Sequence, residues 1–547
     1  MPCLLVPAVA EAAAPTLSHL FPAGGQRGTK VIVTCSGKFD WPPQVFAPGL
    51  DVKPTADAGK LEVTIPADLP ADRAWLRLYN AEGASASVPF LIGTLPEVAE
   101  QEPNNTLKAP QAIADPKVTI NGVLAGADVD GYAVTLQAGQ TLVAALDANT
   151  RLGSPMDAIL QIATPDGIVV AENHDDLGLD PRLAYTARQT GSYIVRLFAF
   201  PSAPDTTIAF RGGDNYVYRL TLTTGPYLTH TLPLTVSRTA PEVVEAQGWN
   251  IPAGTKLPAV PFGGARLADF PELEPLDELR KSPDSRLAVV FDAGLAGTAR
   301  VRQSPFAVAM VPATQDPANP PTLPVGSAAT GCLRAPKQKD TYRLPLQKGQ
   351  HVIVSLESQS LDLPVDPLLQ LVDPKGAVVA EVDDAGALRD AVLSHVAAQD
   401  GEYRIVATDR FGHGGPRFVY LLTARLEEPD FELSIAADSL TIPADKPAEL
   451  AVKIIRRKTG PAVVGPITIQ PRDLPAGITA PAVTSEPTGP SSEEVKLTFT
   501  GTGAAYSGPL RIVGTATQPK ELTRLARVPA KLGVSFDTLW LTSLAKP

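Results

Sequence analysis

Apolar and polar residues alternate along many short stretches of this chain. In YAVTLQAG (132–139) and SYIVRLFA (192–199), large apolar residues recur at every second position, beginning at Tyr132 and Tyr193. This period of two is typical of β-strands with one buried face. The Pro-Asp-Gly at 165–167 lies between the apolar runs ILQIA and IVVAE, where proline fixes φ and glycine accepts a positive φ, so it predicts a tight hairpin turn. Only ELEPLDELRK (272–281) has the spacing of a short amphipathic helix.

Two long stretches of the chain match each other. DGYAVTLQAGQ (130–140) answers DTYRLPLQKGQ (340–350), and TGSYIVRLFA (190–199) answers DGEYRIVATD (400–409). Between them, SPMDAILQIATPDGIVVAENHDD answers LPVDPLLQLVDPKGAVVAEVDDA with a slip of one residue. A register kept over such a length indicates an internal duplication of a whole domain, because two copies are too few for a solenoid.

The intervening segments are also strand-like, and Pro-rich or acidic stretches separate them. We therefore predict an all-β chain of about five β-sandwich domains arranged as a string, since one hydrophobic core cannot serve 547 residues. The predicted plan is a signal-peptide remnant at 1–14, Ig-like domains at 15–93, 226–312 and 430–547, and the duplicated sandwich at 97–224 and 318–427.

Composition supports a folded protein that works outside the cytoplasm. The 55 prolines and 43 glycines show no short period and punctuate the apolar runs as turns do. A net charge of −11, with no basic stripe, argues against a nucleic-acid surface. MPCLLVPAVAEAAAPT resembles the end of a signal peptide with cleavage near Ala14, although a frayed terminus would read similarly. We expect a secreted, periplasmic or cell-surface location.

The remaining composition excludes two further possibilities. The sequence contains no stretch of 18 or more apolar residues, so it predicts no membrane span. With Cys3 in the segment expected to be cleaved, Cys35 and Cys332 remain in different predicted domains and form no disulfide framework.

One set of oxygen-bearing residues predicts a calcium site in the first copy. Two carboxylates and two amides flank Pro103, which keeps the segment out of a helix, and two aspartates precede the strand that begins near Tyr132. Two extended segments side by side would bring six hard oxygen ligands together, as Ca²⁺ prefers. The expected ligands are Glu100, Glu102, Asn104, Asn105, Asp128 and Asp130. The alternative is a solvated polar linker, and no site is expected in the second copy, which has ANPPTLP there.

Other acidic residues are shared by both copies and favour a structural role. They are Asp157, Asp175 and Asp176 in the first copy and Asp366, Asp383 and Asp384 in the second. Because they persist in the copy that lacks the expected ligand motif, we interpret them as short carboxylates that accept backbone N–H bonds in turns.

No catalytic motif is present in the sequence. The six histidines fall in no H-E-x-x-H pattern, and no G-x-S-x-G, GxGxxG or phosphate-binding loop occurs. His174 beside Asp175 is the most suggestive acid–base group, but a polar hairpin loop accounts for it. The four tryptophans, Trp41, Trp75, Trp249 and Trp540, are interpreted as core residues of the Ig-like domains rather than as a sugar-stacking face.

The first copy resembles the bacterial pre-peptidase C-terminal domain. The resemblance is carried by EQEPNNT (100–106), ADVDGYAVTLQAGQ, SPMDAILQIATPDG, ENHDD and TGSYIVRLFA; the second copy lacks the EPNN element. That family is a β-sandwich similar to the collagen-binding domains of clostridial collagenases, and the resemblance implies calcium held by the Glu-x-Glu-Pro-Asn-Asn linker and downstream aspartates.

The opening segment, PAGGQRGTKVIV (22–33), resembles an IPT/TIG Ig-like domain, and the whole arrangement is similar to large exported proteins of planctomycete-type bacteria. No protease domain accompanies the repeats. The sequence thus predicts a non-enzymatic, exported array that binds an extracellular or envelope polymer or protein, with calcium stabilising the first repeat. The alternatives are a carbohydrate-binding array, an enzyme with an unfamiliar site and an accessory subunit of a secreted peptidase.

Overall fold

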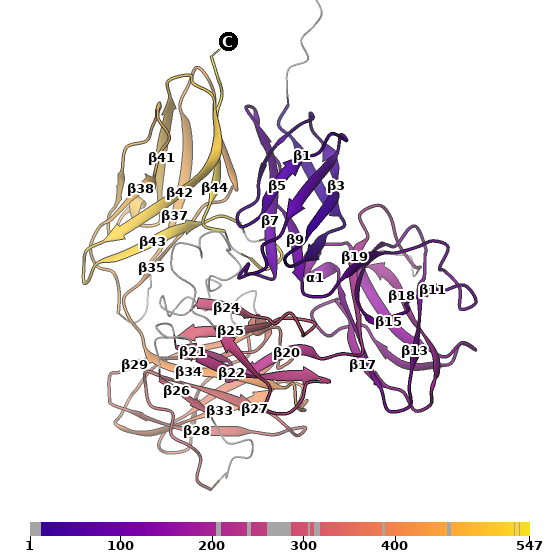
Figure 1. Cartoon of the computed structure of the whole chain (residues 1–547). Helices are drawn as coiled ribbons and strands as arrows, with labels where there is room; N and C mark the ends of the chain where they lie inside the picture. Colours follow the sequence, from indigo (N-terminus) through magenta and orange to yellow (C-terminus); the bar gives the residue numbers. More distant parts are fainter. Residues whose placement is uncertain are drawn as a thin grey trace, which may run out of the picture.

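A computed structural model gives the chain an all-β architecture, which confirms the predicted tandem array of β-sandwich domains (Figure 1). It describes residues 13–203, 209–237, 242–259, 286–304, 307–310, 318–384, 389–456, 461–529, 531–534 and 536–546. Residues 1–12 of the predicted signal-peptide remnant and the helix candidate at 272–281 lie outside this part. Among the described residues, no helix combines the length and apolarity needed to cross a bilayer.

The first unit pairs a four-stranded sheet with a five-stranded sheet. One has the order β1 (Thr16–Phe21), β3 (Lys30–Lys38), β6 (Lys60–Thr64), β5 (Asp51–Pro54). The other has the order β2 (Gly24–Gln26), β9 (Val88–Gly93), β7 (Arg73–Asn80), β4 (Gln44–Phe46), with β8 (Gly83–Ala84) beside β7. Because alternate residues such as Val33, Leu61 and Val63 turn inward, they are fully buried between the sheets.

The first repeat follows directly, as a sandwich of two five-stranded sheets. One sheet runs β10 (Glu97–Ala99), β12 (Lys117–Val123), β19 (Val217–Thr223), β14 (Thr141–Asp147), β17 (Arg182–Thr186). The facing sheet runs β11 (Gln111–Ala112), β13 (Asp130–Leu136), β18 (Gly191–Pro201), β15 (Met156–Ala163), β16 (Val169–Asn173), and α1 (Asn149–Leu152) is one helical turn. The alternating apolar residues of β13 and β18 lie in the core, and Gly167 turns the β15–β16 hairpin at φ +92°.

The second repeat has the same strand order, except that among the described residues its second sheet has no strand in the place of β11. Its sheets are β26 (Ala307–Met310), β27 (Ser327–Cys332), β34 (Val419–Leu426), β29 (His351–Glu357), β32 (Ala391–Val396) and β28 (Asp340–Leu346), β33 (Gly401–Asp409), β30 (Pro367–Val372), β31 (Val378–Val382). The 3₁₀ turn η3 (Gln359–Leu361) takes the place of α1. Since β26 pairs with β27, this unit begins upstream of residue 318, and residues assigned to the third domain by sequence belong to its sheet.

The third and fifth units complete the array. The third has the sheets β20 (Tyr227–Leu232), β22 (Glu242–Trp249), β23 (Lys256–Ala259) and β21 (Thr235–Ser237), β25 (Ala299–Ser304), β24 (Arg286–Val290). The fifth is built from β36 (Ser439–Ile442), β44 (Leu539–Ser543), β42 (Tyr506–Ala516), β43 (Leu522–Arg527), β35 (Phe431–Ser434), β37 (Ala448–Arg456), β41 (Glu494–Gly501) and β39 (Ile478–Thr479), with β38 (Ile467–Arg472), β40 (Val483–Ser485) and the turn η4 (Pro490–Ser492).

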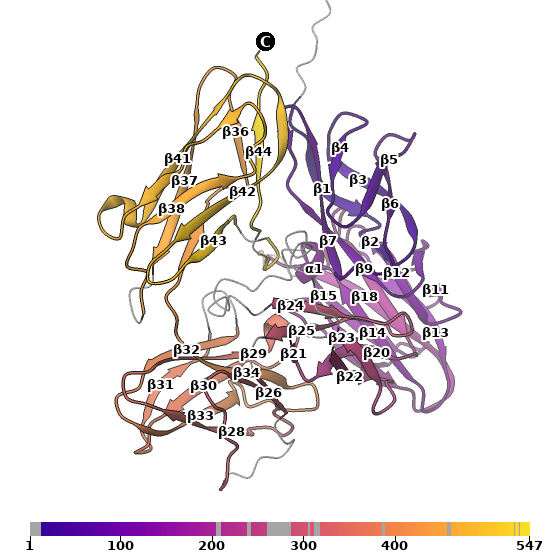
Figure 2. The ribbon, with the colours of Figure 1, turned by 60° about the vertical axis from the view of Figure 1, so that its left-hand side comes forward.

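The five units do not lie in a row as a string would. The chain folds back, so that the fifth unit lies beside the first in both ribbon views, with the second repeat below them (Figures 1 and 2). The buried apolar cluster of the first unit is continuous with Leu234 and Leu287 of the third unit and Leu361 of the second repeat. The units therefore share apolar surface in addition to chain connections.

Four of the units also meet in one buried network of charges, the junction ion network. Asp72 of the first unit accepts from Arg151 of the first repeat at 2.5 Å and lies 3.6 Å from Arg300 of the third unit. Arg300 in turn lies 3.3 Å from Asp362 of the second repeat. Burial alone would raise the pKa of Asp72, but the surrounding guanidiniums outweigh it and hold that pKa well below its usual range.

Candidate metal centre

Three of the predicted ligands converge at one end of the first repeat. Glu100 directly follows β10, where its N–H donates to the Asn121 carbonyl at 2.9 Å, and Asp130 is the first residue of β13. One carboxylate oxygen from each of Glu100, Glu102 and Asp130 lies within 4.8 Å of the others. Asp130 is fully buried, Glu100 is half-buried and Glu102 is exposed, so the cluster has a closed floor and an open side.

Two tyrosines form the floor of this cluster. The Tyr218 hydroxyl on β19 lies 2.9 Å from Oε2 of Glu100 and also hydrogen-bonds to Oδ2 of Asp130. The Tyr132 hydroxyl hydrogen-bonds in turn to the Tyr218 hydroxyl. Gly122 is required beside them, since a β-carbon there would collide with the Tyr218 hydroxyl and the Glu100 carboxylate.

The other predicted ligands lie around the rim. The Asn104 N–H donates to Oε2 of Glu102 and to Oδ1 of Asn105, each at 3.0 Å. The Asn105 amide donates to Oδ1 of Asp128, so these two side chains bind each other beside the carboxylate cluster. The Asn104 carbonyl accepts from the N–H of Gly131 at 3.1 Å, which places Asn104 close in space to Asp130, the residue before Gly131.

Two buried side chains of the cluster keep polar atoms without a partner. Asn104 is 0% exposed, and neither its Oδ1 nor its Nδ2 is hydrogen-bonded; Oδ1 of Asp130, also 0% exposed, is equally unsatisfied. Each such group costs about 1–3 kcal/mol when it is left unpaired. Carboxylate and amide oxygens are hard donors, and a Ca²⁺ ion takes six to eight of them at roughly 2.3–2.6 Å. The donor set and its unsatisfied oxygens thus fit a calcium ion.

The pKa values of the buried carboxyl groups in the cluster are raised by burial, and no positive side chain of the described residues balances them. Burial raises the pKa of Asp130 to about 8, and the carboxylates of Glu100, Asp128 and Glu102 act in the same direction, whereas the Tyr218 hydrogen bond opposes them. Burial also raises the pKa of Glu100. Metal ligands must be deprotonated, so a bound divalent cation would displace these protons.

The tyrosines and Gly122 are the residues that sequence reasoning missed. The signal for them was present, because NYVYRL (215–220) answers RFVYLL (417–422) in the second copy. There the Tyr420 hydroxyl donates to Asp340 at 2.5 Å and lies 2.7 Å from that of Tyr342. Aligning the last strand of each copy would have revealed the shared pair.

The acidic residues common to both repeats lie in structural contacts or at the surface. Asp176 binds both terminal nitrogens of Arg417 in the second repeat, at 2.7 and 2.8 Å. Asp383 pairs with Arg410 at 2.5 Å, while Asp384 and Asp175 are exposed. Neither Asp157 nor Asp366 belongs to the carboxylate cluster, and both are half-buried.

Two further aspartates, which sequence reasoning did not single out, anchor the helical turn of each repeat. Asp180 accepts from the N–H groups of Ala148, Asn149 and Thr150 at 2.7–3.1 Å. Asp390 accepts from three successive N–H groups of the second repeat, those of residues 358–360, at 2.7–3.0 Å. Burial raises the pKa of Asp180 to about 7, which is a consequence of this structural position.

The residues around His174, which the sequence indicated as the best candidate for acid–base chemistry, do not form an acid–base site in the structure. Nε2 of His174 lies 3.5 Å from Glu172, and the imidazole is exposed. Its neighbour Asp176 is occupied by Arg417 and, at 3.2 Å, by Arg182. These contacts leave His174 without the buried, oriented carboxylate that general-base catalysis uses.

No family model matches this chain, and no curated protein matches it in sequence. Among solved structures, the pre-peptidase C-terminal domain of a Bacillus anthracis collagenase aligns over 20% of this chain and 100% of its own, at 12% identity and a TM-score of 0.17. The N-terminal four Ig domains of Dscam1 align over 98% of this chain and 100% of theirs, at 8% identity and a TM-score of 0.19.

SGBP-B of the Bacteroides ovatus mixed-linkage glucan utilization locus, solved with a mixed-linkage heptasaccharide, aligns over 77% of this chain and 76% of its own, at 11% identity and a TM-score of 0.14. All three neighbours are β proteins, and scores this low assign no function to the chain.

Proposed function

We propose that this chain is an exported, non-catalytic binding scaffold of the cell envelope or extracellular space, with a first repeat stabilised by calcium. The observation that carries the proposal is the carboxylate cluster of Glu100, Glu102 and Asp130, next to which the buried Asn104 keeps unpaired polar atoms. A cation with hard-ligand preference would satisfy the carboxylate oxygens and Oδ1 of Asn104.

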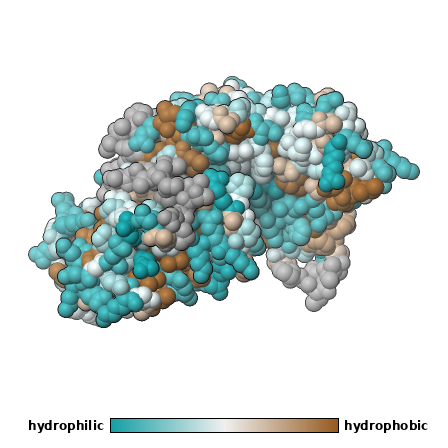
Figure 3. Space-filling model, turned by 90° about the horizontal axis from the view of Figure 1, so that it is seen from below, coloured by the Kyte–Doolittle hydropathy of each residue, from teal (hydrophilic) through white to brown (hydrophobic). Residues whose placement is uncertain are grey.

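The position of the cluster supports a role in stability rather than in chemistry. Glu100 and Glu102 belong to the segment between the first unit and β12, so calcium would tie this segment to β13. Other groups with displaced pKa values lie in structural contacts, as Asp72 does in the junction ion network and Asp180 at its helical turn. The face in Figure 3 is mainly hydrophilic with small, separate hydrophobic patches, as expected of a protein surrounded by water.

Calcium titration of the EDTA-treated full chain, followed by calorimetry, tests the metal. We expect one tight site per chain, a higher melting temperature with Ca²⁺ than with EDTA, and a weaker response to Mg²⁺, which keeps its own water shell. Glu100→Ala with Glu102→Ala should abolish binding. Asp383→Ala with Asp384→Ala, which removes the same charge from the second repeat, should leave it intact. A melting temperature that changes neither with calcium nor with the first pair of substitutions contradicts the proposal.

The scaffold role needs a separate experiment. Immobilised full chain should retain a polymer or protein from a native envelope fraction, and the purified chain should turn over none of a panel of peptides, esters and glycosides. Measurable turnover that is lost on substitution of a described side chain would overturn the non-catalytic assignment.

A further inference from the structure

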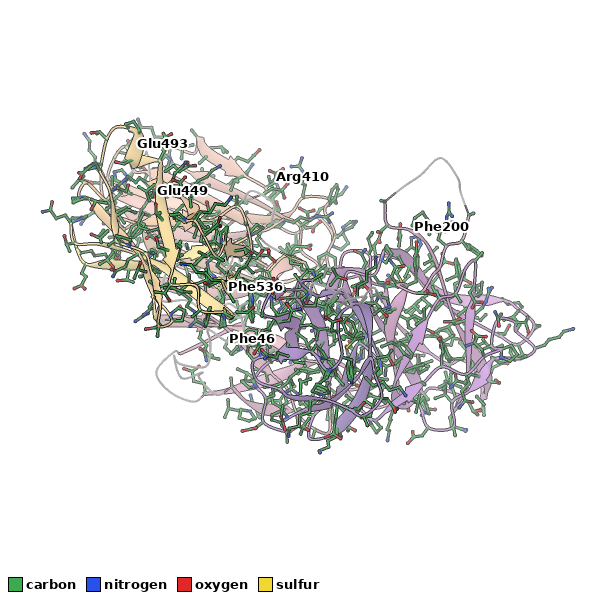
Figure 4. All side chains as sticks on the ribbon, turned by 90° about the horizontal axis from the view of Figure 1, so that it is seen from above. Phe46, Phe200, Arg410, Glu449, Glu493 and Phe536 are labelled. Carbon is green, nitrogen blue, oxygen red and sulfur yellow. The ribbon has the colours of Figure 1, made fainter. Side chains whose placement is uncertain are left out.

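A cavity lies at the boundary between the first and fifth units. Its volume is about 230 Å³, and its walls come from β4 and β7 of the first unit and from β38, β42 and the 536–540 segment of the fifth. Four aromatic rings line it, and Figure 4 places the labelled Phe46 and Phe536 close to each other where the two units meet. The fold creates this cavity only by bringing the two ends of the chain together.

The rings are arranged in two pairs, each with one member from either unit. Phe46 meets Trp540 edge-on with ring centroids 5.3 Å apart, and Trp75 meets Phe536 at 5.0 Å. Trp540 is 2% exposed and its indole N–H donates to Ser507 at 3.0 Å, so it is a rigid part of the wall. The half-buried Phe46 and Phe536 offer apolar ring surface to the cavity.

Charged side chains of both signs line much of the rest of the cavity. Arg77 lies 3.7 Å from Asp438, and Arg511 lies 3.7 Å from Asp537. At the open rim, the exposed Arg472 is followed by the exposed Asp473. The lining has one more guanidinium than carboxylates, and Asp438, which lies outside the lining, faces Arg77. The cavity therefore has little net charge to attract an ion, but it presents planar donors and acceptors to a ligand rich in hydroxyl groups.

We infer that this cavity binds one neutral sugar residue of a polysaccharide. The apolar C–H face of a pyranose fits against the aromatic rings, while the guanidinium and carboxylate groups bind its hydroxyls. The volume lies below the roughly 300 Å³ at which drug-sized ligand sites begin, so a single ring is held and the rest of the polymer leaves past Arg472. This inference rests on the proposed binding function and names its ligand class and site.

Calorimetric titration of the full chain with neutral hexasaccharides of glucose, mannose and xylose, together with tryptophan fluorescence, tests the inference. We expect saturable binding of at least one of them, with a change in indole emission because Trp75 and Trp540 line the cavity. Arg472→Ala, at the exposed rim, should weaken binding at least tenfold without altering the fold. Phe536→Ala should do the same, with solution X-ray scattering to check that the first and fifth units remain together.

Phe200→Ala is the matched control, because Phe200 is also a half-buried aromatic residue and lies away from the cavity in Figure 4. No binding of any neutral hexasaccharide overturns the inference, and so does binding that Arg472→Ala and Phe536→Ala leave unchanged. Tighter binding of an oligogalacturonate or an acidic peptide overturns the neutral-sugar assignment. Retention of an envelope polymer by the Arg472→Ala chain at the wild-type level would leave the scaffold function standing and move its site elsewhere.

Discussion

The two repeats share most of their strand order and a tyrosine pair, yet the equivalent buried aspartate has different hydrogen-bond partners in each. In the second repeat, Oδ1 of Asp340 accepts from the Gln338 amide at 2.8 Å and Oδ2 from Tyr420. In the first repeat, the equivalent Asp130 keeps its Oδ1 unpaired. Gln338 aligns with Asp128, so one copy has an amide donor where the other has a further carboxylate.

This difference shows how a duplicated site can change its means of neutralising a buried charge. The second repeat satisfies Asp340 internally: burial raises the pKa of Asp340, and hydrogen bonds from Tyr420 and Gln338 offset part of that rise. The first repeat gathers Glu100 and Glu102 around Asp130, which adds negative charge that the proposed calcium ion would neutralise. Each repeat is thus the natural control for the other within a single molecule.

The largest expected effect is calcium protection confined to the first repeat. Hydrogen exchange in β12, β13 and β19 should slow on adding Ca²⁺, by up to about 4 kcal/mol in opening free energy at 1,000 times the dissociation constant. Exchange in β27, β28 and β34 of the same chain should stay unchanged, and Asp130→Asn should remove the response. Equal slowing of exchange in both repeats would contradict a calcium site confined to the first repeat.

The next largest effect concerns the aspartate that anchors the helical turn of each repeat. It should be the same in both repeats, because both have this anchor. Asp180→Ala and Asp390→Ala each delete a buried acceptor of three backbone N–H groups, and each should lower the stability of its own repeat by about 2–3 kcal/mol. Local hydrogen exchange measures both changes, and the exposed Asp175→Ala should have almost none. A large difference between the two variants would mean that the repeats diverge beyond the carboxylate cluster.

Removing the internal donor of the second repeat should have a moderate effect. Gln338→Ala strips the partner from Oδ1 of the buried Asp340 and should cost about 1–2 kcal/mol, whether or not calcium is present. Asp128→Ala at the aligned position should cost less without calcium and should weaken calcium binding. Urea unfolding followed by exchange in β13 and β28 distinguishes the two; a calcium-dependent effect of Gln338→Ala would contradict the assignment.

The pH dependence should be gradual, at most about 1.4 kcal/mol per pH unit for one group. The pKa of Asp130 is raised from 3.8 to about 8 in the folded chain, so the folded state binds the proton more tightly. Without calcium, the stability of the first repeat should therefore fall as pH rises from about 4 to about 8, and Asp130→Asn should flatten the curve. Calcium affinity should rise over the same range, which isothermal titration at several pH values would measure.

The sequence allowed the strands and the duplication to be predicted, because both depend on local patterns. Alternation from Tyr132 and Tyr193 placed the core faces of β13 and β18 correctly, and the match between copies followed from register alone. The sequence grouped the three carboxylates as neighbours, and they do lie together, although Glu100 follows β10 of one sheet and Asp130 begins β13 of the facing sheet. Tyr218 lies on the final strand of the sandwich, far along the chain, and only the pairing of β12 with β19 brings it to Glu100.

Contacts between units were beyond prediction for a different reason. Trp75 and Trp540 were interpreted as core residues of separate domains, and their burial fits that interpretation, but they line one cavity at a domain boundary. Nothing in local periodicity records which surfaces of two sandwiches meet. The chain was for the same reason expected to be a string, whereas it folds back on itself.

The junction ion network limits how this protein can be divided. A fragment ending before Arg151 would leave Asp72 without its 2.5 Å partner, and one lacking the third unit would remove Arg300 as well. A carboxylate stripped of its cations in an apolar setting is strongly destabilising, by about 3–5 kcal/mol. Single sandwiches excised for study would therefore be less stable than the same units in the intact molecule. A substitution that destabilises one of the four joined units should also destabilise the other three.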